Sequence, residues 1–313
     1  MRHEKQLNNL PSAEQFKIAS GKQQVIVTEV GATLRSYTFD NCELIDGFCE
    51  TDMATGSRGQ PLIPWPNRLK DGTYRFDGTV HQLPIDEPER NNAIHGLLRW
   101  ENWLVNNKRD DLVEMRYTLH PRPGYPFTLT VFIAYELNDK GLTVTTTALN
   151  NGTATLPLGI GFHPYLKVGT EYINDATLMI PADTVLNLDQ RGIPVGKQNV
   201  TGTKWDFRNA KNISDTRLDT AFYNLKRNCH GVAETVLANP YDNRRITLWM
   251  DNEFGYLMCY TGDTLSETAR RRKAIALEPM TCPPNGFCSG EDLILLKPSE
   301  QFKASWGIMP FDF

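Results

Sequence analysis

Two histidines and one glutamate occupy short segments whose composition suits proton-transfer chemistry. His95 lies in NNAIHG (91–96), His163 in GIGFHPY (159–165) and Glu278 in ALEPM (276–280). Imidazoles, and carboxylates whose pKa is shifted, titrate near neutral pH and can therefore give and take protons in an enzyme. Gly or Pro in each segment fixes the backbone where a side chain must be aimed. We expect these three residues to meet in one acid–base site that uses no metal and no cofactor.

The composition is that of a folded protein without a nucleic-acid or membrane partner. Of the 313 residues 40% are hydrophobic and the net charge is −4, whereas nucleic-acid-binding domains usually carry a basic surface. The one basic run, 270–273, precedes an apolar stretch and is interpreted as a solvated loop. Residues 1–17 lack the apolar core of a signal peptide, and no apolar run has the length of a membrane span. Six cysteines without a CxxC pair suit a reducing compartment, so we expect a cytoplasmic location.

Apolar and polar residues alternate with period two along the whole chain, and turn residues separate the alternating stretches. Strands are predicted at 24–39 with a break at Gly31, in a hairpin at 72–83, and at 112–119, 128–137, 142–149, 176–180, 245–250, 255–260, 274–277 and 302–308. No segment has the length and caps of a helix. The pattern predicts an all-β sandwich or barrel forming a single domain over residues 1–313. A monomer and a homodimer both remain open.

Two long connections carry residues suited to ligand binding. The first, 50–71, contains Trp65, Asn67 and Arg68, and the second, 84–103, contains His95 and Arg99. Loops supported by a rigid β-scaffold are frequent sites of binding and catalysis. We therefore expect these two connections to line the site.

Five segments resemble, in order, motifs of the aldose 1-epimerase (galactose mutarotase) family. The segments are PNRLKDGTYRFDG (66–78), IHG (94–96), FHPYL (162–166), LDTAF (218–222) and ALEP (276–279). Any one of them would be a weak match, but together they follow the family's order and span nearly the whole chain. The resemblance implies a large antiparallel β-supersandwich with few short helices. It also implies an isomerase that interconverts the α- and β-anomers of a free monosaccharide.

The resemblance assigns chemical roles to the three titratable residues. Glu278 would be the base that removes the proton of the anomeric hydroxyl, His163 the acid that protonates the ring oxygen, and His95 a hydrogen-bonding residue near that oxygen. Opening a pyranose ring requires these two proton transfers, ideally together. We therefore expect Glu278 to be ionised and His163 to be charged.

By the same resemblance, Arg68 and Asp219 would hold sugar hydroxyls. A guanidinium is a rigid forked donor, and a carboxylate can accept from two hydroxyls at once. Asn67, Trp65 and Arg99 are expected beside them as further substrate-binding residues.

Each binding residue also has a purely structural interpretation. Arg68 could pair with Asp71 or Asp77, Asp219 could be a turn residue, and His95 could cap a turn in its loop. A buried Glu278 is harder to explain in this way, because an unpaired carboxylate in an apolar strand is costly.

Three tryptophans lie in or near these segments. Tryptophans in such positions more often pack in a core or rim than stack on a ligand. Among Trp65, Trp100 and Trp103, Trp65 is the best candidate for stacking.

Two other functions are less consistent with the sequence. A non-catalytic carbohydrate-binding protein on the same fold would be expected to lack Glu278 or His163, and both are present. A glycoside hydrolase would need a second catalytic carboxylate, and none has a setting comparable to that of Glu278.

The sequence departs from galactose-type members of the family in the segments expected around the sugar. IPWP (63–66) stands where those members have Gly-Arg-x-Ala, GLLRW (96–100) where they have Gly-Gly and Gly-Phe, and MTCPPNG (280–286) where they have Gln and Pro-Asp-Ala. The preferred sugar is therefore open. A similar branch comprises sulfoquinovose mutarotases, whose sugar carries a C6 sulfonate to which Arg99 or Trp65 could donate.

Overall fold

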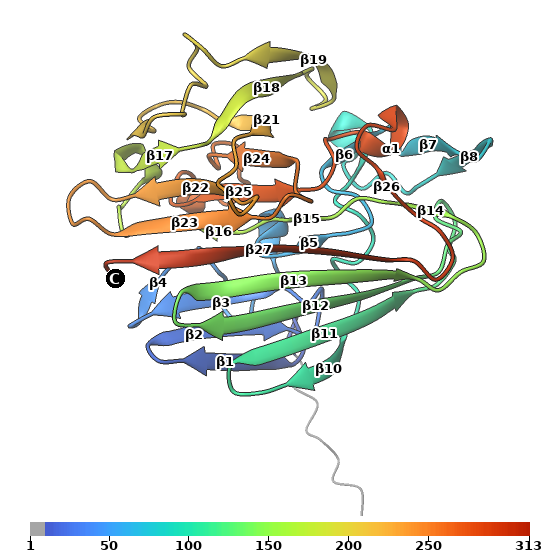
Figure 1. The fold of residues 1–313 in the computed structure, drawn as a ribbon, viewed down its shortest axis with the longest axis horizontal. Coiled ribbons are helices and arrows are strands. Elements are labelled where there is room, and N and C mark those ends of the chain that lie inside the picture. The colour runs from blue at the N-terminus through green and yellow to red at the C-terminus, as the bar shows by residue number, and fades with distance from the viewer. Residues whose placement is uncertain (1–9) are drawn as a thin grey trace, which may run out of the picture.

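A computed structural model describes residues 10–313, whose regular secondary structure consists almost entirely of β-strands. The first nine residues, part of the N-terminal segment considered above, lie outside the described residues. Nine of the described strands form the largest sheet, which runs across the molecule in Figure 1. In order across this sheet they are β10 (Leu104–Lys108), β11 (Leu112–Leu119), β12 (Leu129–Asn138), β13 (Gly141–Asn150), β27 (Gln301–Phe311), β23 (Arg245–Met250), β22 (Ala233–Ala238), β17 (Thr177–Met179) and β20 (Lys211–Asn212).

A second sheet of eight described strands packs against the nine-stranded sheet on the side of β22, β23 and β27 (Figure 1). Its strands are β19 (Pro194–Asn199), β18 (Ala182–Leu188), β21 (Asp219–Leu225), β24 (Tyr256–Tyr260), β25 (Ile275–Met280), β15 (Gly161–Phe162), β5 (Pro61–Leu62) and β16 (Tyr165–Leu166), the last pairing with β25. All of the pairings are antiparallel.

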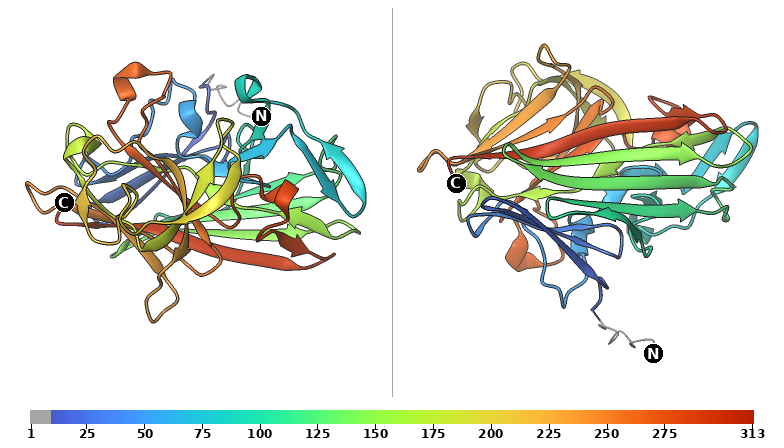
Figure 2. Two further views of the ribbon diagram at one scale, coloured as in Figure 1. Left: turned by 90° about the horizontal axis from the view of Figure 1, so that it is seen from above. Right: turned by 60° about the horizontal axis from the view of Figure 1, so that its bottom comes forward.

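Smaller sheets complete the described part of the chain. The first strand of a four-stranded sheet lies against β11 and β12 (Figure 2). The strands of this sheet are β1 (Gln15–Ser20), β2 (Gln23–Thr28), β3 (Leu34–Phe39) and β4 (Cys42–Glu43). The two-stranded pairs are β6 (Arg68–Lys70) with β9 (Asn92–Ile94), β7 (Thr73–Phe76) with β8 (Thr79–Gln82), and β14 (Leu156–Leu158) with β26 (Ile294–Leu296).

Helices in residues 10–313 are few and short. They are α1 (Gly286–Ser289) and the 3₁₀ turns η1 (Thr55–Ser57), η2 (Pro88–Arg90), η3 (Ile173–Asp175) and η4 (Thr268–Arg270). No helix in this part of the chain combines the length and the apolar character needed to cross a membrane.

The structure confirms the all-β prediction, and each predicted strand region contains a strand. The region 24–39 contains β2 and β3, and the hairpin β7–β8 turns at Asp77 and Gly78 as expected. Several strands were not predicted, among them β1, β10, β18, β19, β21 and β22. The predicted strand at 274–277 is longer than expected, because β25 continues through Glu278 and Pro279 to Met280. Glu278 therefore lies within a strand whose residues are all buried.

The two faces of the eight-stranded sheet have different surroundings. Successive side chains of a strand point to opposite faces, so neighbouring residues of one strand can serve the core and the site. On one face Phe162, Leu257 and Leu277 join the main hydrophobic core. There Phe162 packs against Trp306 of β27, with ring centroids 5.1 Å apart. This contact fixes the sheet on its apolar side and leaves the face that carries Glu278 for the site.

The segment that presents His95 is held by close backbone packing. His95 has a positive φ of 62°, and Gly96 after it has a φ of +75°. Gly96 forms a parallel bridge with Ile63, and the Ile63 carbonyl accepts hydrogen bonds from the N–H groups of Leu97 and Leu98. A Cβ on residue 96 would lie 2.1 Å from the Ile63 oxygen, so only glycine fits at this position.

We predict that Gly96→Ala destabilises the fold much more than Gly78→Ala. Both glycines have a φ near +75°, but a Cβ at Gly78 meets no atom within 4 Å. The left-handed backbone costs an alanine roughly 1–2 kcal/mol at either position, and only Gly96→Ala adds a collision with backbone. Urea unfolding of the two variants should therefore differ by about 2 kcal/mol or more. Equal losses of unfolding free energy would contradict a rigid contact with Ile63.

Candidate active site

A cavity of about 670 Å³ brings together most of the residues singled out in the sequence. Its lining includes seven of the eight predicted site residues, namely Asn67, Arg68, His95, Arg99, His163, Asp219 and Glu278. These positions are spread over more than 200 residues of sequence and come from three kinds of element: the eight-stranded sheet, the β6–β9 pair and the long connections.

The register of the eight-stranded sheet sets His163 opposite Glu278. Gly161 on β15 lies opposite Met280, and Tyr165 on β16 lies opposite Ala276. The same register, continued between them, sets residue 163 opposite residue 278. Side chains of directly opposed residues lie on one face with their Cβ atoms about 4.5–5.5 Å apart. Two local motifs distant in sequence thus become one pair.

A neighbouring row of the same sheet adds Asp219 and Tyr260 to the cavity. Asp219 begins β21 and lies opposite Tyr260 on β24, which in turn lies opposite Ala276 on β25. Because Ala276 and Glu278 are two residues apart, both rows project from the same face. Asp219 is exposed, so its carboxylate is accessible to a ligand.

The His163–Glu278 pair is almost completely removed from water. His163 Nε2 lies 3.3 Å from Glu278 Oε1, and the two side chains are 7% and 2% exposed. In residues 10–313 neither His163 Nδ1 nor Glu278 Oε2 has a hydrogen-bond partner. Two unpartnered buried polar atoms are costly to a fold, and they are the kind of atoms that a polar ligand would satisfy.

Burial decides where the proton of this pair resides. Burial, and then the nearby charge of Asp219, raise the pKa of Glu278 well above its ordinary range, although Arg68 acts in the opposite direction. Burial, with Arg58, Arg99 and Arg68, lowers the pKa of His163 to about 3. Both shifts favour the neutral carboxylic acid and the neutral imidazole over a separated ion pair in the ligand-free cavity. This differs from the expected carboxylate and imidazolium, because separated charges are poorly solvated in a buried site.

His95 is a neutral hydrogen-bond donor at the wall of the cavity. The backbone N–H of Asn67 donates to the ring nitrogen Nδ1 of His95 at 3.2 Å, and the backbone N–H of His95 donates to the Asn67 carbonyl at 2.9 Å. Because Nδ1 accepts, the neutral ring carries its proton on Nε2. Burial, followed by the charges of Arg99, His163 and Arg68, lowers the pKa of His95 well below its ordinary value. The ring lies edge-on to that of His163, with centroids 5.4 Å apart.

Arg68 lines the cavity and is also part of an ion pair. Its Nε lies 3.0 Å from both carboxylate oxygens of Glu87, and neither Asp71 nor Asp77 is its partner among the ion pairs of the described residues. Burial alone would lower the pKa of Arg68, but the hydrogen bond to Glu87 and the charges of Asp219, Glu87 and Glu278 raise it. Glu87 is itself fixed by the amide of Asn92 at 2.8 Å. The guanidinium is thus held in place beside the acid–base pair.

Arg99 lines the cavity while its terminal nitrogens are already engaged. Nη2 donates to Asp86 at 2.9 Å and to the Ile94 carbonyl at 3.0 Å, and Nη1 donates to Ser57 at 3.2 Å. Its Nε is buried and has no partner in the described residues. The guanidinium also lies 6.0 Å from the centre of the Trp100 ring, so it has the cation–π contact that its position next to a tryptophan allows.

Trp65 is the predicted site residue that the structure does not bring to the cavity. It is 3% exposed and packs against Phe287 in the core, with ring centroids 5.7 Å apart. Trp100 instead lines the cavity and is 50% exposed, whereas Trp103 is buried. Core or rim packing, the interpretation favoured for the three tryptophans, fits this structure. The alternative of Trp65 as a substrate-binding residue does not fit it, because the chain directs the Trp65 indole into the core and leaves Trp100 at the rim.

Several lining residues were missed in the sequence: Asp86, Glu87, Trp100, Tyr165 and Tyr260. Tyr165 follows His163 by two residues in a strand region, and this spacing places both on one face. The two acids lie in the connection already chosen for His95 and Arg99. No local signal marks Tyr260, which reaches the site only through strand pairing. Residues 10–313 contain no cluster of His, Cys, Asp and Glu placed to bind a metal ion.

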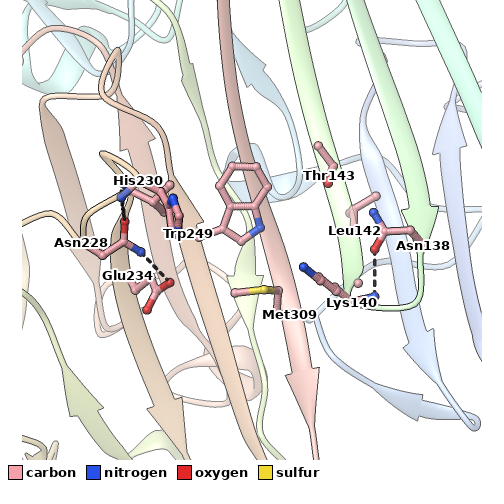
Figure 3. Close-up of a pocket in the computed structure, with 11 residues that line it drawn as sticks. Asn138, Lys140, Leu142, Thr143, Asn228, His230, Glu234, Trp249 and Met309 are labelled. Carbon is pink, nitrogen blue, oxygen red and sulfur yellow. Dashed lines mark hydrogen bonds between the residues drawn. The ribbon is translucent and has the colours of Figure 1, made fainter.

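A second cavity, of about 300 Å³, lies over β13, β27 and β23 (Figure 3). Trp249 and Met309 lie in its floor, between His230 and Glu234 on one side and Lys140 on the other. These three titratable side chains are all exposed. The second cavity therefore lacks a buried acid–base pair, and the larger cavity is the candidate active site.

Comparison with known proteins identifies relatives across the whole chain. A family model described as Aldose 1-epimerase matches residues 14–308. The uncharacterized protein YihR of Escherichia coli K12 is 33% identical over 298 residues, which cover 95% of this chain and 93% of that protein. Galactose mutarotase of Homo sapiens is 25% identical over 233 residues, which cover 68% and 67% of the two chains.

Solved structures share the fold at low sequence identity. A GalM/aldose epimerase homologue from C. elegans superposes with a TM-score of 0.85 at 19% identity, covering 96% of this chain and 99% of that one. Galactose 1-epimerase from Lactobacillus acidophilus NCFM gives a TM-score of 0.80 at 23% identity, covering 95% and 94%. The predicted large antiparallel β-fold is therefore confirmed.

We predict that Glu278→Gln stabilises the protein increasingly as the pH rises. Because the pKa of Glu278 is raised above its ordinary value of 4.5, the folded protein keeps a proton that the unfolded chain loses above about pH 4.5. The extra free energy of unfolding that this group provides is therefore complete below about pH 4.5, and it is lost as the pH rises through the pKa of Glu278 in the folded protein. Urea unfolding at several pH values should show the variant gaining on the wild type by on the order of 1 kcal/mol per pH unit in this window.

The matched control is Glu234→Gln, which makes the same change at an exposed carboxylate. A stability difference between Glu278→Gln and wild type that stays constant from pH 4.5 to pH 8 would contradict the raised pKa of Glu278.

Proposed function

The chain belongs to the aldose 1-epimerase family of isomerases, and we propose that it interconverts the α- and β-anomers of a free aldohexose by acid–base ring opening. The observation that carries this proposal is the buried His163–Glu278 pair, whose 3.3 Å contact lies on the floor of a cavity large enough for a monosaccharide. A pair that shares one proton can both take a proton from a sugar and return one to it.

The chemistry follows from the number of protons on the pair. Glu278 as a carboxylate takes the proton of the C1 hydroxyl, while His163 as an imidazolium gives its proton to the ring oxygen. The C1–O5 bond breaks, and the open-chain aldehyde faces a protonated Glu278 and a neutral His163. Rotation about C1–C2 and the reverse proton transfers close the ring as the other anomer.

Burial favours ring opening in this scheme because opening removes both charges from the pair. The raised pKa of Glu278 makes its carboxylate a stronger base, and the lowered pKa of His163 makes its imidazolium a stronger acid. The charged form must first be reached when the sugar binds, by moving the shared proton from Glu278 to His163. Sugar hydroxyls that donate to Glu278 Oε2, which lacks a protein partner, would stabilise the carboxylate at that step.

The remaining residues of the cavity are assigned to binding and orientation. His95 donates from Nε2 toward the ring oxygen without needing a charge. Arg68 donates to sugar hydroxyls from its terminal nitrogens while its Nε holds Glu87. Asp219 accepts from a pair of hydroxyls at the open end of the cavity. Asn67 acts through its backbone, since its N–H fixes the tautomer of His95.

A neutral sugar is the substrate class we favour. Arg99 pairs with Asp86, Arg68 with Glu87, and Arg90 lies 3.8 Å from Glu87. Arg68 and Arg90 share Glu87, and the carboxylates of Glu89 and Asp219 also line the cavity, which leaves little net positive charge to attract an anion. A 6-sulfonated aldohexose is the second candidate, because Arg99 lines the cavity and its buried Nε has no partner.

We predict that Glu278→Gln lowers anomer exchange by about 10²-fold or more, since the amide keeps the shape but cannot accept the proton. Binding of the sugar should persist. Polarimetry on fresh α-glucose, or exchange spectroscopy by NMR on glucose and galactose, measures the rate. Near-normal exchange in this variant would rule out Glu278 as the base.

The same assay separates the other two functions. A glycoside hydrolase would release the chromophore from a chromogenic glycoside, and a non-catalytic binding protein would bind sugar without accelerating exchange. Wild-type protein that does either of these, and does not exchange anomers, would contradict the proposed function.

We predict that Arg99→Met distinguishes the two substrate classes. If the substrate carries a C6 sulfonate, the loss of a charge-assisted hydrogen bond should cost kcat/KM for that sugar roughly 1.5–3 kcal/mol, and glucose much less. If the substrate is neutral, both sugars should be affected alike, because Arg99 then serves mainly to hold Asp86, Ser57 and the Ile94 carbonyl. Asp86→Asn is the matched control, since it removes the other partner of the same ion pair.

A further inference from the structure

His163 stacks on Tyr165, and the Tyr165 ring also has a cation–π contact with Arg58. Its imidazole lies nearly parallel to the ring of Tyr165, at 19° and with centroids 4.9 Å apart. The guanidinium carbon of Arg58 lies 4.6 Å from the centre of the same tyrosine ring. The Tyr165 hydroxyl donates to the Gly56 carbonyl at 3.0 Å, which fixes the orientation of the ring.

Arg58 is a buried cation that is anchored on its far side. Its side chain is 2% exposed, and Nε and Nη2 each lie 3.2 Å from Asp46 Oδ2. Nη1 donates to the Thr55 carbonyl at 2.9 Å. Asp46 is held in turn by Arg270 at 3.1 Å, and its N–H donates to the Tyr165 carbonyl at 2.8 Å. The anchor therefore fixes both the cation and the backbone of the residue on which it stacks.

We propose that Arg58 is a positioning residue for His163, which acts through Tyr165 to fix the plane of the imidazole and to oppose the build-up of positive charge on it. This inference rests on the proposed function and deepens it. Arg58 does not line the cavity, although Tyr165 and His163 do. It can therefore influence the reaction without touching the sugar.

The charges around His163 support this role. The charged and titratable groups that face it are Glu278 on β25, Tyr165 on β16, Arg68 on β6, His95 after β9, Arg99 in the following loop, and Arg58 over the Tyr165 ring. After burial, Arg58 is the charged group that lowers the pKa of His163 most, ahead of Arg99 and Arg68. A cation over the tyrosine ring also attracts its π-electrons, which would otherwise stabilise an imidazolium on the same ring.

The test is the double variant Arg58→Gln/Asp46→Asn, which removes the cation together with the carboxylate that pairs with it. With ¹⁵N-labelled histidine, the His163 signal is assigned by its absence in His163→Asn and followed from pH 8 down to pH 3. We expect the wild-type ring to become charged only at the lower end of this range, because its pKa is lowered to about 3. In the double variant the signal should reach the imidazolium value at a pH that is higher by about one unit. We also expect kcat to fall about 10-fold while KM changes less than about 3-fold.

Arg270→Gln is the matched control, because it also removes a cation from Asp46 but has no contact with the Tyr165 ring. Its His163 titration and its kcat should match those of the wild type. A double variant that titrates and turns over like the wild type would overturn the inference. So would an Arg270→Gln variant that shifts His163 by the same amount, since the effect would then belong to Asp46 alone.

A second variant covers failure of the double variant to fold. Arg58→Lys keeps the charge and the pairing with Asp46 but loses the planar stack, so kcat should fall while KM is maintained, and a wild-type kcat would overturn the positioning role. A wild-type protein that does not exchange anomers contradicts the proposed function. The histidine titration still tests the stack in that case.

Discussion

The structure depends on the cost of holding ionisable groups out of water. Glu278 on β25 and His163 between β15 and β16 lie 3.3 Å apart, and their side chains are 2% and 7% exposed. Neutral forms are favoured there because a buried charge is poorly solvated. The same cost raises the basicity of the carboxylate and the acidity of the imidazolium, which is the combination that ring opening requires. A site on the surface would leave both groups near their ordinary pKa values and provide less driving force for proton transfer.

The surroundings of this pair limit how much charge the cavity holds. Arg68, Arg99 and Arg58 each lie close to a carboxylate, from Glu87, Asp86 and Asp46 respectively. These cations still lower the pKa values of the two histidines, but they do not make the cavity strongly positive. Their fixed geometry has another use, because a guanidinium that is already held by a carboxylate loses little further conformational entropy when a sugar binds.

Strand pairing holds the site in place. The residues on the other face of the same sheet offset the free energy that the buried polar groups of the site cost. Glu278 and His163 leave buried polar atoms without partners, which disfavours folding. Phe162 and Leu277, one residue away from them in sequence, pack into the main core. Period-two alternation thus allows one short strand to serve stability on one face and chemistry on the other.

The sequence by itself determined the all-β class and many of the strands, and it singled out the candidate acid–base residues, because these depend on local alternation and on residue types that are unusual in their setting. A carboxylate in an apolar strand and a histidine in a segment that contains glycine and proline are visible without a structure. Only the tertiary structure decided the partners. Arg68 pairs with Glu87 and neither of the aspartates near it in sequence, and Trp100 lines the cavity while Trp65 enters the core. The raised pKa of Glu278 likewise follows from burial by distant strands, and burial is a property of the folded chain that no local segment contains.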